Sequence, residues 1–274
     1  MDLNTIAEIA QPTGRAELPE WAAGDAWLGG GTWLFSEPQV HLRRLIDLQA
    51  LNWPALTIGD GSLQIAATCT VAQLDALVCP PDWTAAPLIG QCCRAFLASF
   101  KVWKTATVGG NLCLALPAGP MISLTAALDG FCTLWMPSGA TRQMPVFEFV
   151  TGNNRTSMMS GELLRSIDIP LAALRRRCAF RQISLTPAGR SAALLIGTLH
   201  DDGLELTVTA STTRPIRLSF GGVPNRRVLQ DALVEHIPDT TYHDDVHGKP
   251  LWRKAMTLRL AEEIRMELTD GLRP

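Results

Sequence analysis

The chain has 274 residues, a length that fits one elaborate domain or two ordinary ones. Hydrophobic residues make up 47% and charged residues 18%, so the chain can bury a core and falls outside the disordered class. Its net charge of −2 argues against a nucleic-acid-binding protein, since such domains are basic. No apolar run approaches the ~20 residues that cross a bilayer, so we expect no membrane insertion.

The N-terminal residues and the cysteine spacing predict the cellular compartment of the protein and whether it binds a metal. Residues 1–4 have no basic segment and lead into no apolar one, so we expect no signal peptide and a cytoplasmic protein. Seven cysteines are scattered between residues 69 and 178 without a CxxC motif. We therefore expect reduced, mostly buried thiols and no metal or iron–sulfur site in this chain.

The first quarter of the chain predicts short elements around glycine turns. Residues 27–34 form a glycine-rich loop, and residues 42–48 form a short element. Two alternating segments around residues 59–62 predict a β-hairpin. Thr70 with Gln73 is a capping-box pattern that opens a helix through Val78, which the following two prolines end.

The next hundred residues alternate helical and extended patterns. Residues 87–100 are apolar at mixed spacing and predict a buried helix, and residues 107–111 form a second glycine turn. Residues 122–128 are helical and residues 132–136 predict a strand. Residues 162–170 then lead to the sharpest boundary in the sequence, the three arginines that begin at Arg175.

The last hundred residues have a different pattern of predicted strands and helices. Residues 194–199 and 204–210 predict a hairpin, and apolar residues three or four apart over 251–268 predict an amphipathic helix that starts near Pro250. Within it Arg259 and Glu263 are paired at i,i+4. We expect an α+β protein with one domain over residues 1–172 and a smaller α+β domain over residues 173–274.

The two glycine turns are the strongest candidates for a binding site. Residues 29–32 read Gly-Gly-Gly-Thr and residues 107–111 read Thr-Val-Gly-Gly-Asn. Main chain without side chains can bring its N–H groups close to an anion such as a diphosphate. Neither turn matches the Rossmann or P-loop pattern. The alternative that each turn only makes a tight corner stays open.

The other polar residues give weaker indications of a binding or catalytic site. His243 and His247 could ligate a metal at i,i+4 spacing, but a polar loop explains them better because no third ligand cluster stands out. We interpret residues 160–162 as a helix cap and residues 175–177 as a solvated linker or a subunit contact. No acid–base pair or catalytic triad emerges. The absence indicates a chain that holds a cofactor without performing the substrate chemistry.

Several ordered motifs resemble the FAD-binding medium subunits of molybdenum hydroxylases. Relatives in that family include carbon monoxide dehydrogenase, xanthine dehydrogenase, 4-hydroxybenzoyl-CoA reductase, and bacterial aldehyde and nicotine dehydrogenases. Residues 28–34 look like the first FAD loop and residues 107–113 like the second. Shorter matches continue to the C-terminal helix, at residues 45–48, 63–70, 127–129, 162–164, 167–170, 179–181 and 252–253.

The resemblance implies a fold in which FAD lies extended between two α+β subdomains, as in the vanillyl-alcohol-oxidase type. The cofactor is held non-covalently, with its diphosphate on main-chain amides of both glycine motifs. Electrons arrive from [2Fe–2S] clusters of a small partner subunit, which receives them from a molybdopterin on a large partner. The substrate of the complex binds the large partner, and the assembly is a dimer of heterotrimers.

Cofactor-binding positions carry over onto this sequence residue by residue, while catalytic and metal-binding residues are expected on partner chains only. The expected FAD-binding residues are Leu28, Gly29, Gly30, Gly31, Thr32, Trp33, Leu34, Thr107, Val108, Gly109, Gly110, Asn111, Ala115, Pro120, Ile167 and Arg181.

Three departures from the family pattern affect this site. The segment 114–120 reads Leu-Ala-Leu-Pro-Ala-Gly-Pro, where the family has polar side chains and, at Pro120, an acid that contacts the cofactor. Trp33 replaces a small or polar residue, and Arg181 stands where lysine is common. Losing one charge-assisted hydrogen bond costs about 1.5–3 kcal/mol, so we expect weaker but retained FAD.

Two alternatives come from other classes of protein. A scaffold subunit that has lost FAD is motivated by Leu116 and Pro120, and it predicts a colourless protein. A stand-alone flavin oxidase would need a base in its C-terminal domain, and none is evident there.

Overall fold

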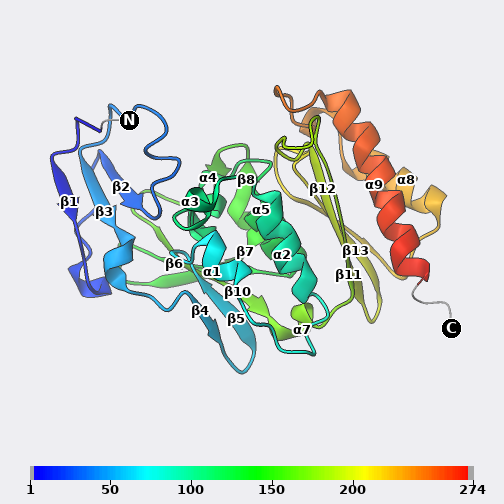
Figure 1. The fold of residues 1–274 in the computed structure, drawn as a ribbon, viewed down its shortest axis with the longest axis horizontal. Helices are drawn as coiled ribbons and strands as arrows, with labels where there is room; N and C mark the ends of the chain where they lie inside the picture. The colour runs from blue at the N-terminus through cyan, green and yellow to red at the C-terminus, as the bar shows by residue number, and fades with distance from the viewer. Residues whose placement is uncertain (1–2, 271–274) are drawn as a thin grey trace.

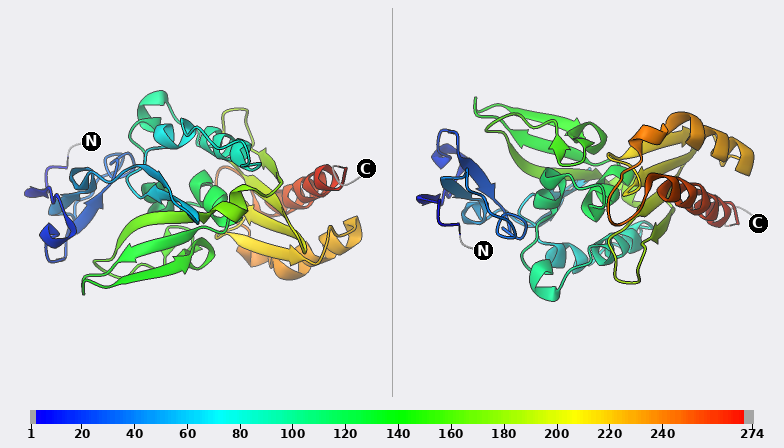
Figure 2. Two further views of the ribbon diagram at one scale, coloured as in Figure 1. Left: turned by 90° about the horizontal axis from the view of Figure 1, so that it is seen from below. Right: turned by 90° about the horizontal axis from the view of Figure 1, so that it is seen from above.

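The strands of the computed structural model, which describes residues 3–270, form a three-stranded, a five-stranded, a four-stranded and a two-stranded sheet. The mixed α+β class is as predicted. Figures 1 and 2 show the N-terminal sheet at one end of the molecule, the helices and the five-stranded sheet in the middle, and the C-terminal sheet at the other end.

The N-terminal sheet is parallel and positions the first glycine motif. Its strands are β1 (Glu8–Ala10), β3 (Arg44–Asp47) and β2 (Asp25–Leu28), in that spatial order. The η1 turn (Arg15–Glu17) lies between β1 and β2, and η2 (Leu48–Leu51) follows β3. The glycine motif begins where β2 ends.

The five-stranded sheet is antiparallel, in the order β4-β5-β10-β6-β7. The predicted hairpin around residues 59–62 is confirmed as β4 and β5, and the strand predicted at residues 132–136 is β6. The segments are β4 (Leu56–Ile58), β5 (Ser62–Ala66), β6 (Phe131–Trp135), β7 (Thr141–Pro145) and β10 (Leu163–Pro170), with a separate two-stranded ribbon of β8 (Val150–Gly152) and β9 (Arg155–Thr156).

Short helices accompany this sheet. They are α1 (Val71–Asp75), α2 (Ala86–Ala95), α3 (Phe100–Trp103), α4 (Val108–Leu114), α5 (Pro120–Ala127), α6 (Val146–Phe149) and α7 (Leu171–Leu174). The capping box of Thr70 and Gln73 is confirmed at the start of α1, and α5 was also predicted.

Three sequence predictions in this region are corrected. Helix α1 ends at Asp75, short of Val78. The helix predicted over residues 87–100 ends at Ala95, because the chain turns and Ser99 caps a new helix, α3. Residues 160–162 do not cap a helix: Gly161 has φ +78° and leads into strand β10.

The C-terminal sheet is a four-stranded antiparallel meander. It consists of β11 (Cys178–Ile183), β12 (Ala193–His200), β13 (Gly203–Thr209) and β14 (Ile216–Phe220), and it includes the predicted hairpin. The predicted amphipathic helix is α9 (Pro250–Asp270), which packs on β11 and β12, while α5 contacts β12 and β13 (Figure 1). Helix α8 (Arg226–His236) contacts α9 and β14, and η3 (Asp239–Thr241) lies between the two helices.

The main hydrophobic core crosses the predicted boundary at residue 172. Leu194, Ile196 and Ala210 of the C-terminal sheet belong to the same buried cluster as the five-stranded sheet and its helices. Ser123 on α5 and Thr209 on β13 also lie 2.6 Å apart through their hydroxyl oxygens. One face of the C-terminal sheet therefore completes the core of the N-terminal half, while its other face forms a second buried cluster with α8 and α9, which includes Leu206, Leu233 and Ile264. Over residues 3–270, no helix has the length and apolar character needed to cross a membrane.

Candidate functional site

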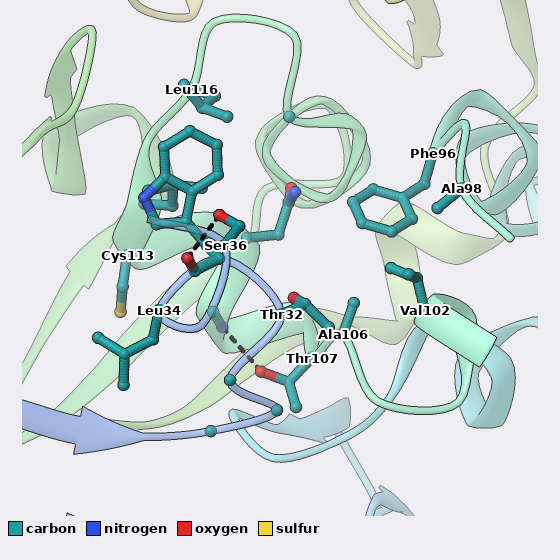
Figure 3. Close-up of a pocket in the computed structure, with 18 of the residues that line it drawn as sticks. Thr32, Leu34, Ser36, Phe96, Ala98, Val102, Ala106, Thr107, Cys113 and Leu116 are labelled. Atoms are coloured by element: carbon teal, nitrogen blue, oxygen red, sulfur yellow. Dashed lines mark hydrogen bonds between the residues drawn. The ribbon is translucent and has the colours of Figure 1, made fainter. Parts of the chain in front are cut away.

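A cavity of about 590 Å³ lies where the first glycine motif meets the helical segment of the middle region. Figure 3 shows Phe96, Ala98 and Val102 on one side of it, and Leu34 and Cys113 on the other. The cavity is lined by residues 27–34, Ser36, residues 95–98, Val102, Ala106, Thr107, Gly110, Asn111, Cys113, Leu114, Leu116, residues 118–120 and Arg190.

The first glycine motif forms one wall of this cavity. All seven residues of 28–34 predicted for the cofactor site line it. A Cβ on Gly30 would lie 1.6 Å from the carbonyl oxygen of Thr105, so glycine is required where the loop crosses that main chain. Within residues 3–270, no acceptor receives the main-chain N–H groups of Gly30, Gly31 and Thr32. This loop therefore presents unused donors beside the cavity, as the anion-binding hypothesis requires.

The second glycine motif is the first turn of helix α4, not the isolated turn that we predicted. Thr107 is the N-cap residue, and its Oγ1 accepts a hydrogen bond from the Gly110 N–H at 3.0 Å. The N–H groups of Val108 and Gly109 donate to Cys69 and Ala67 main-chain oxygens, at 2.8 and 3.0 Å.

The consequence is a different role for this motif. The Asn111 N–H donates to the Thr107 oxygen, so the amides of residues 108–111 all have acceptors inside the chain. Gly109 lies against Ala67, where a Cβ would be only 2.5 Å from the alanine methyl. Thr107, Gly110 and Asn111 still line the cavity, while Val108 and Gly109 do not. The motif brings the helix start close to the cavity without presenting free amides.

The remaining predicted residues are divided between the cavity and the rest of the molecule. Pro120 lines the cavity as the first residue of α5. Ala115, Ile167 and Arg181 do not line it. Ile167 is fully buried in β10, and Ala115 is the left-handed C-cap of α4. The Arg181 guanidinium instead pairs with two acids of α9, lying 2.7 Å from Glu267 and 3.2 Å from Glu263.

Sequence reasoning missed the apolar wall and the cation of the cavity. Phe96 and Ala98 come from the segment that joins α2 to α3 and Val102 from α3 itself, and no local pattern distinguishes them from core residues. Arg190 comes from the loop between β11 and β12, in the predicted second domain. Only tertiary structure brings both groups to the glycine motif.

The cavity combines surfaces suited to a large planar ligand with a polar tail. Aromatic and aliphatic side chains give an apolar wall, and the glycine loop gives main-chain donors. The Asn111 Oδ1 accepts a hydrogen bond from the Met121 N–H at 3.1 Å, which fixes the orientation of that amide group. An isoalloxazine ring and a diphosphate match these two surfaces, so the residues present fit FAD.

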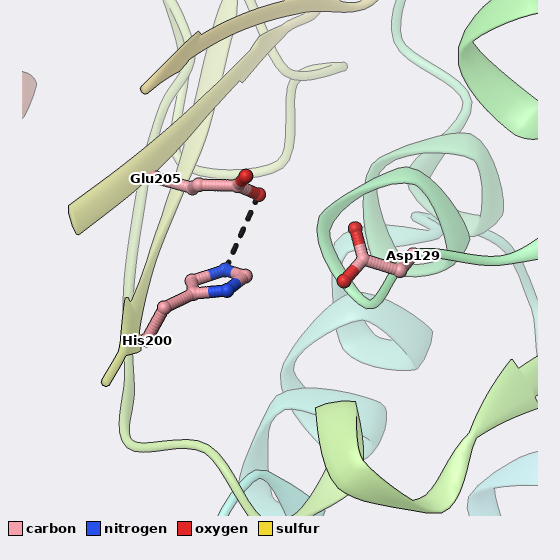
Figure 4. Close-up of side chains that lie close together, drawn as sticks. All are labelled: Asp129, His200 and Glu205. Atoms are coloured by element: carbon pink, nitrogen blue, oxygen red, sulfur yellow. Dashed lines mark ion pairs between the residues drawn. The ribbon is translucent and has the colours of Figure 1, made fainter. Parts of the chain in front are cut away.

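A second polar cluster lies away from the cavity, where the β12–β13 hairpin approaches the end of α5 (Figure 4). Asp129, His200 and Glu205 offer ligand atoms within 4.8 Å of one another, and the His200 Nε2 lies 3.2 Å from Glu205. However, Arg176 and Arg217 both pair with Asp129, the latter at 2.6 Å. Two guanidinium groups already satisfy this carboxylate, so we interpret the cluster as an ion-pair network between the two halves of the chain.

This network corrects the prediction of a solvated arginine linker. Besides Arg176 in the network, Arg175 lies 2.7 Å from Asp82. Arg175 and Arg176 therefore tie the junction to the N-terminal half, whereas Arg177 donates to the Glu267 main-chain oxygen of α9 at 2.8 Å.

The loop with the two predicted histidines is a structural polar loop. His243 lies 3.3 Å from Asp245, which also pairs with the buried Arg253. Burial lowers the pKa of His243 despite the two neighbouring aspartates. Among the described residues, neither histidine belongs to a group that could hold a metal.

Comparison with known proteins places this geometry in a family. Residues 11–172, more than half of the chain, match the model for the FAD-binding domain in molybdopterin dehydrogenase. The chain belongs to that family. It is an FAD-binding protein of the molybdenum hydroxylase type, as the sequence resemblance predicted. Among curated protein sequences, none matches the chain.

Solved structures extend the similarity in fold to the C-terminal region. Quinoline 2-oxidoreductase from Pseudomonas putida 86 is 18% identical, with a TM-score of 0.79 and 99% of each chain covered. Carbon monoxide dehydrogenase from Hydrogenophaga pseudoflava is also 18% identical, with a TM-score of 0.78 over 96% of this chain and 97% of that one. Carbon monoxide dehydrogenase from Oligotropha carboxidovorans is 18% identical, with a TM-score of 0.77 over 94% and 96%.

Proposed function

We propose that this chain is the electron-transfer subunit of a multi-subunit molybdenum hydroxylase. The observation that carries the proposal is the cavity lined by residues 28–34, a loop with unused main-chain donors, together with an apolar wall, in a chain of the FAD-binding family. Residues 28–34, Thr107, Gly110, Asn111 and Pro120 would hold FAD. Bound flavin accepts one or two electrons and so couples one-electron clusters to a two-electron acceptor.

The chain's own contribution is position and electrostatics. The glycine loop orients the diphosphate, and the wall that contains Phe96 and Val102 excludes water from the ring. No residue of this cavity is assigned to acid–base chemistry, which belongs to a partner that binds the substrate. We propose that residues 1–172 form the FAD domain and residues 173–274 the second domain.

The proposed partners are a small subunit with [2Fe–2S] clusters and a large subunit with molybdopterin, assembled as a dimer of heterotrimers in the cytoplasm. The similarity in fold to carbon monoxide dehydrogenase and quinoline 2-oxidoreductase supports this assignment. Co-expression with the products of neighbouring genes, followed by purification and mass measurement, tests it. If this chain separates from the co-expressed iron–sulfur and molybdopterin proteins during purification and binds neither, the proposed assembly is wrong.

The cofactor is tested first by an absorption spectrum of the purified chain. We expect flavin bands near about 370 and 450 nm, and FAD in the supernatant after heating. The alternative of a scaffold subunit is favoured by the apolar Leu116 and Pro120 in the cavity lining. It predicts a colourless protein that does not take up added FAD.

A further inference from the structure

Among the described residues, 3–270, Arg190 is the one charged residue that lines the cavity. It lies in the loop between β11 and β12, so the C-terminal half of the chain brings it to a cavity otherwise built by the N-terminal half. All other lining residues are apolar, small or uncharged polar. Arg190 therefore adds a positive charge to a cavity whose other described polar groups are neutral.

The base of this loop is fixed against one end of the cavity. The Arg253 Nη1 donates to the main-chain oxygens of Ala192 and Ala210, at 2.6 and 2.7 Å. The Ala210 N–H in turn donates to the Pro117 oxygen at 2.9 Å. Pro117 lies between the lining residues Leu116 and Ala118. The main chain at Ala192 is therefore held close to that part of the cavity, and Arg190 is only two residues before it.

The Arg190 side chain has no partner within residues 3–270. It is exposed, and no carboxylate, hydrogen-bond acceptor or aromatic ring of the described chain contacts it. The neighbouring arginines of this half differ, since Arg181, Arg217 and Arg253 each pair with an acid. Pro120, which lines the same cavity, provides no carboxylate where the family has one. The guanidinium is thus available to an anionic ligand.

We propose that Arg190 binds an oxygen-rich, negatively charged group of the cofactor and so contributes to the affinity of the chain for FAD. This assignment rests on the proposed function. Two parts of FAD share the required chemistry: the diphosphate, and the N1–C2 carbonyl edge of the ring, which gains negative charge on reduction. An arginine can make two parallel hydrogen bonds to either.

The test compares Arg190→Gln and Arg190→Lys with the wild type and a control. Arg227→Gln is the control, since its side chain is 90% exposed on α8, outside the cavity lining. The flavin-free proteins are titrated with FAD and with riboflavin, and the flavin midpoint potential is measured. We expect Arg190→Gln to weaken FAD by about tenfold to a hundredfold, the usual range for a hydrogen bond to a charged group. Arg190→Lys should keep part of the affinity, and Arg227→Gln should equal wild type.

The riboflavin titration and the midpoint potential show which of the two parts of FAD Arg190 binds. If Arg190 faces the diphosphate, riboflavin affinity and potential stay unchanged in Arg190→Gln. If it faces the ring edge, riboflavin binds more weakly and the potential falls by about 30 mV for each tenfold preferential loss of reduced flavin. If riboflavin binds too weakly for its affinity to be measured, the midpoint potential alone distinguishes the two cases.

Failure takes two distinguishable forms. If Arg190→Gln binds FAD within twofold of wild type at unchanged potential, Arg190 is not a cofactor ligand, although the proposed function stands. If the wild type takes up no FAD, the proposed function fails and this assignment fails with it. Because Arg190 is exposed and unpaired, Arg190→Gln should keep the melting temperature of wild type, which confirms that it is folded.

Discussion

Gly109 and Gly110 are adjacent, yet the structure predicts opposite consequences for replacing them. A Cβ on Gly109 would lie 2.5 Å from the Ala67 Cβ and 2.6 Å from its carbonyl oxygen, both in the interior. A Cβ on Gly110 would meet only the Thr107 Oγ1, at 2.9 Å, and otherwise faces open space beside the cavity.

These contacts set the expected stabilities. Overpacking at Gly109 costs about 1–3 kcal/mol, against a gain of about 0.5–1 kcal/mol when alanine replaces glycine in a helix, so Gly109→Ala should lose about 1–2 kcal/mol. Gly110→Ala disturbs the Thr107 cap, worth about 1 kcal/mol, but has the same helix gain. Its net change should be within about 0.5 kcal/mol of zero. Gly110→Val adds two methyl groups at the cavity and should release FAD from a folded chain.

The assay pairs urea unfolding with flavin content. Gly109→Ala should shift the unfolding midpoint, whereas Gly110→Ala should not, and Gly110→Val should purify without FAD at near-native stability. If Gly110→Val keeps its full flavin content, the second motif is only a packing corner. If Gly109→Ala unfolds at the wild-type midpoint, the close approach to Ala67 does not constrain residue 109.

Three further predictions concern the supports of the site. Glu162 and Arg142 form an ion pair at 2.7 Å, and the hydrogen bond from Arg142 holds the pKa of Glu162 below its ordinary value of 4.5. The stabilisation that this ion pair gives the folded state is therefore complete above pH 4.5 and is lost as the pH falls through the lowered pKa. Glu162→Gln should cost about 2 kcal/mol at pH 7, and urea unfolding should show that the difference shrinks in acid. Asp129→Asn leaves the guanidinium groups of the network without their shared acid. It should lower the melting temperature, and hydrogen exchange should increase in β12 and β13; unchanged exchange there would contradict an interface role. Arg253→Met leaves buried main-chain oxygens without a donor and removes the arginine partner of Asp245, so it should cost about 3–5 kcal/mol by urea unfolding, and a loss under 1 kcal/mol would refute this.

Elements with strong local signals were predictable from the sequence. The capping box at Thr70 and the hairpin around residues 59–62 are confirmed, and so is the helix predicted from the apolar spacing of residues 251–268. The apolar face predicted for that helix is wrong in its first half, where Leu251 is 79% exposed and Arg253 and Thr257 are buried instead. The Gly109–Gly110 pair misled the prediction, because glycine disfavours helix interiors. Here the Thr107 cap and the contact with Ala67 outweigh that preference.

The cavity was only partly predictable because its walls come from distant segments. Residues 28–34 carry their own signature, a run of glycines after a strand. Phe96 and Val102 look like ordinary core residues, and Arg190 looks like any exposed loop arginine. Arg181 stands where the family commonly has lysine, and its side chain pairs with Glu263 and Glu267 of α9 outside the cavity, which no local sequence pattern indicated.

The shared interior has a consequence for the order in which the protein can mature. Leu194 and Ile196 are synthesised after every residue of the matched FAD domain, yet they complete the packing of that domain's core. A nascent chain that has emerged only to residue 172 still exposes the apolar surface that they cover. The cavity is thus complete only once β12 has been made, so a chain that ends at residue 172 should lack both the core packing of Leu194 and Ile196 and the charged side of the cavity at Arg190.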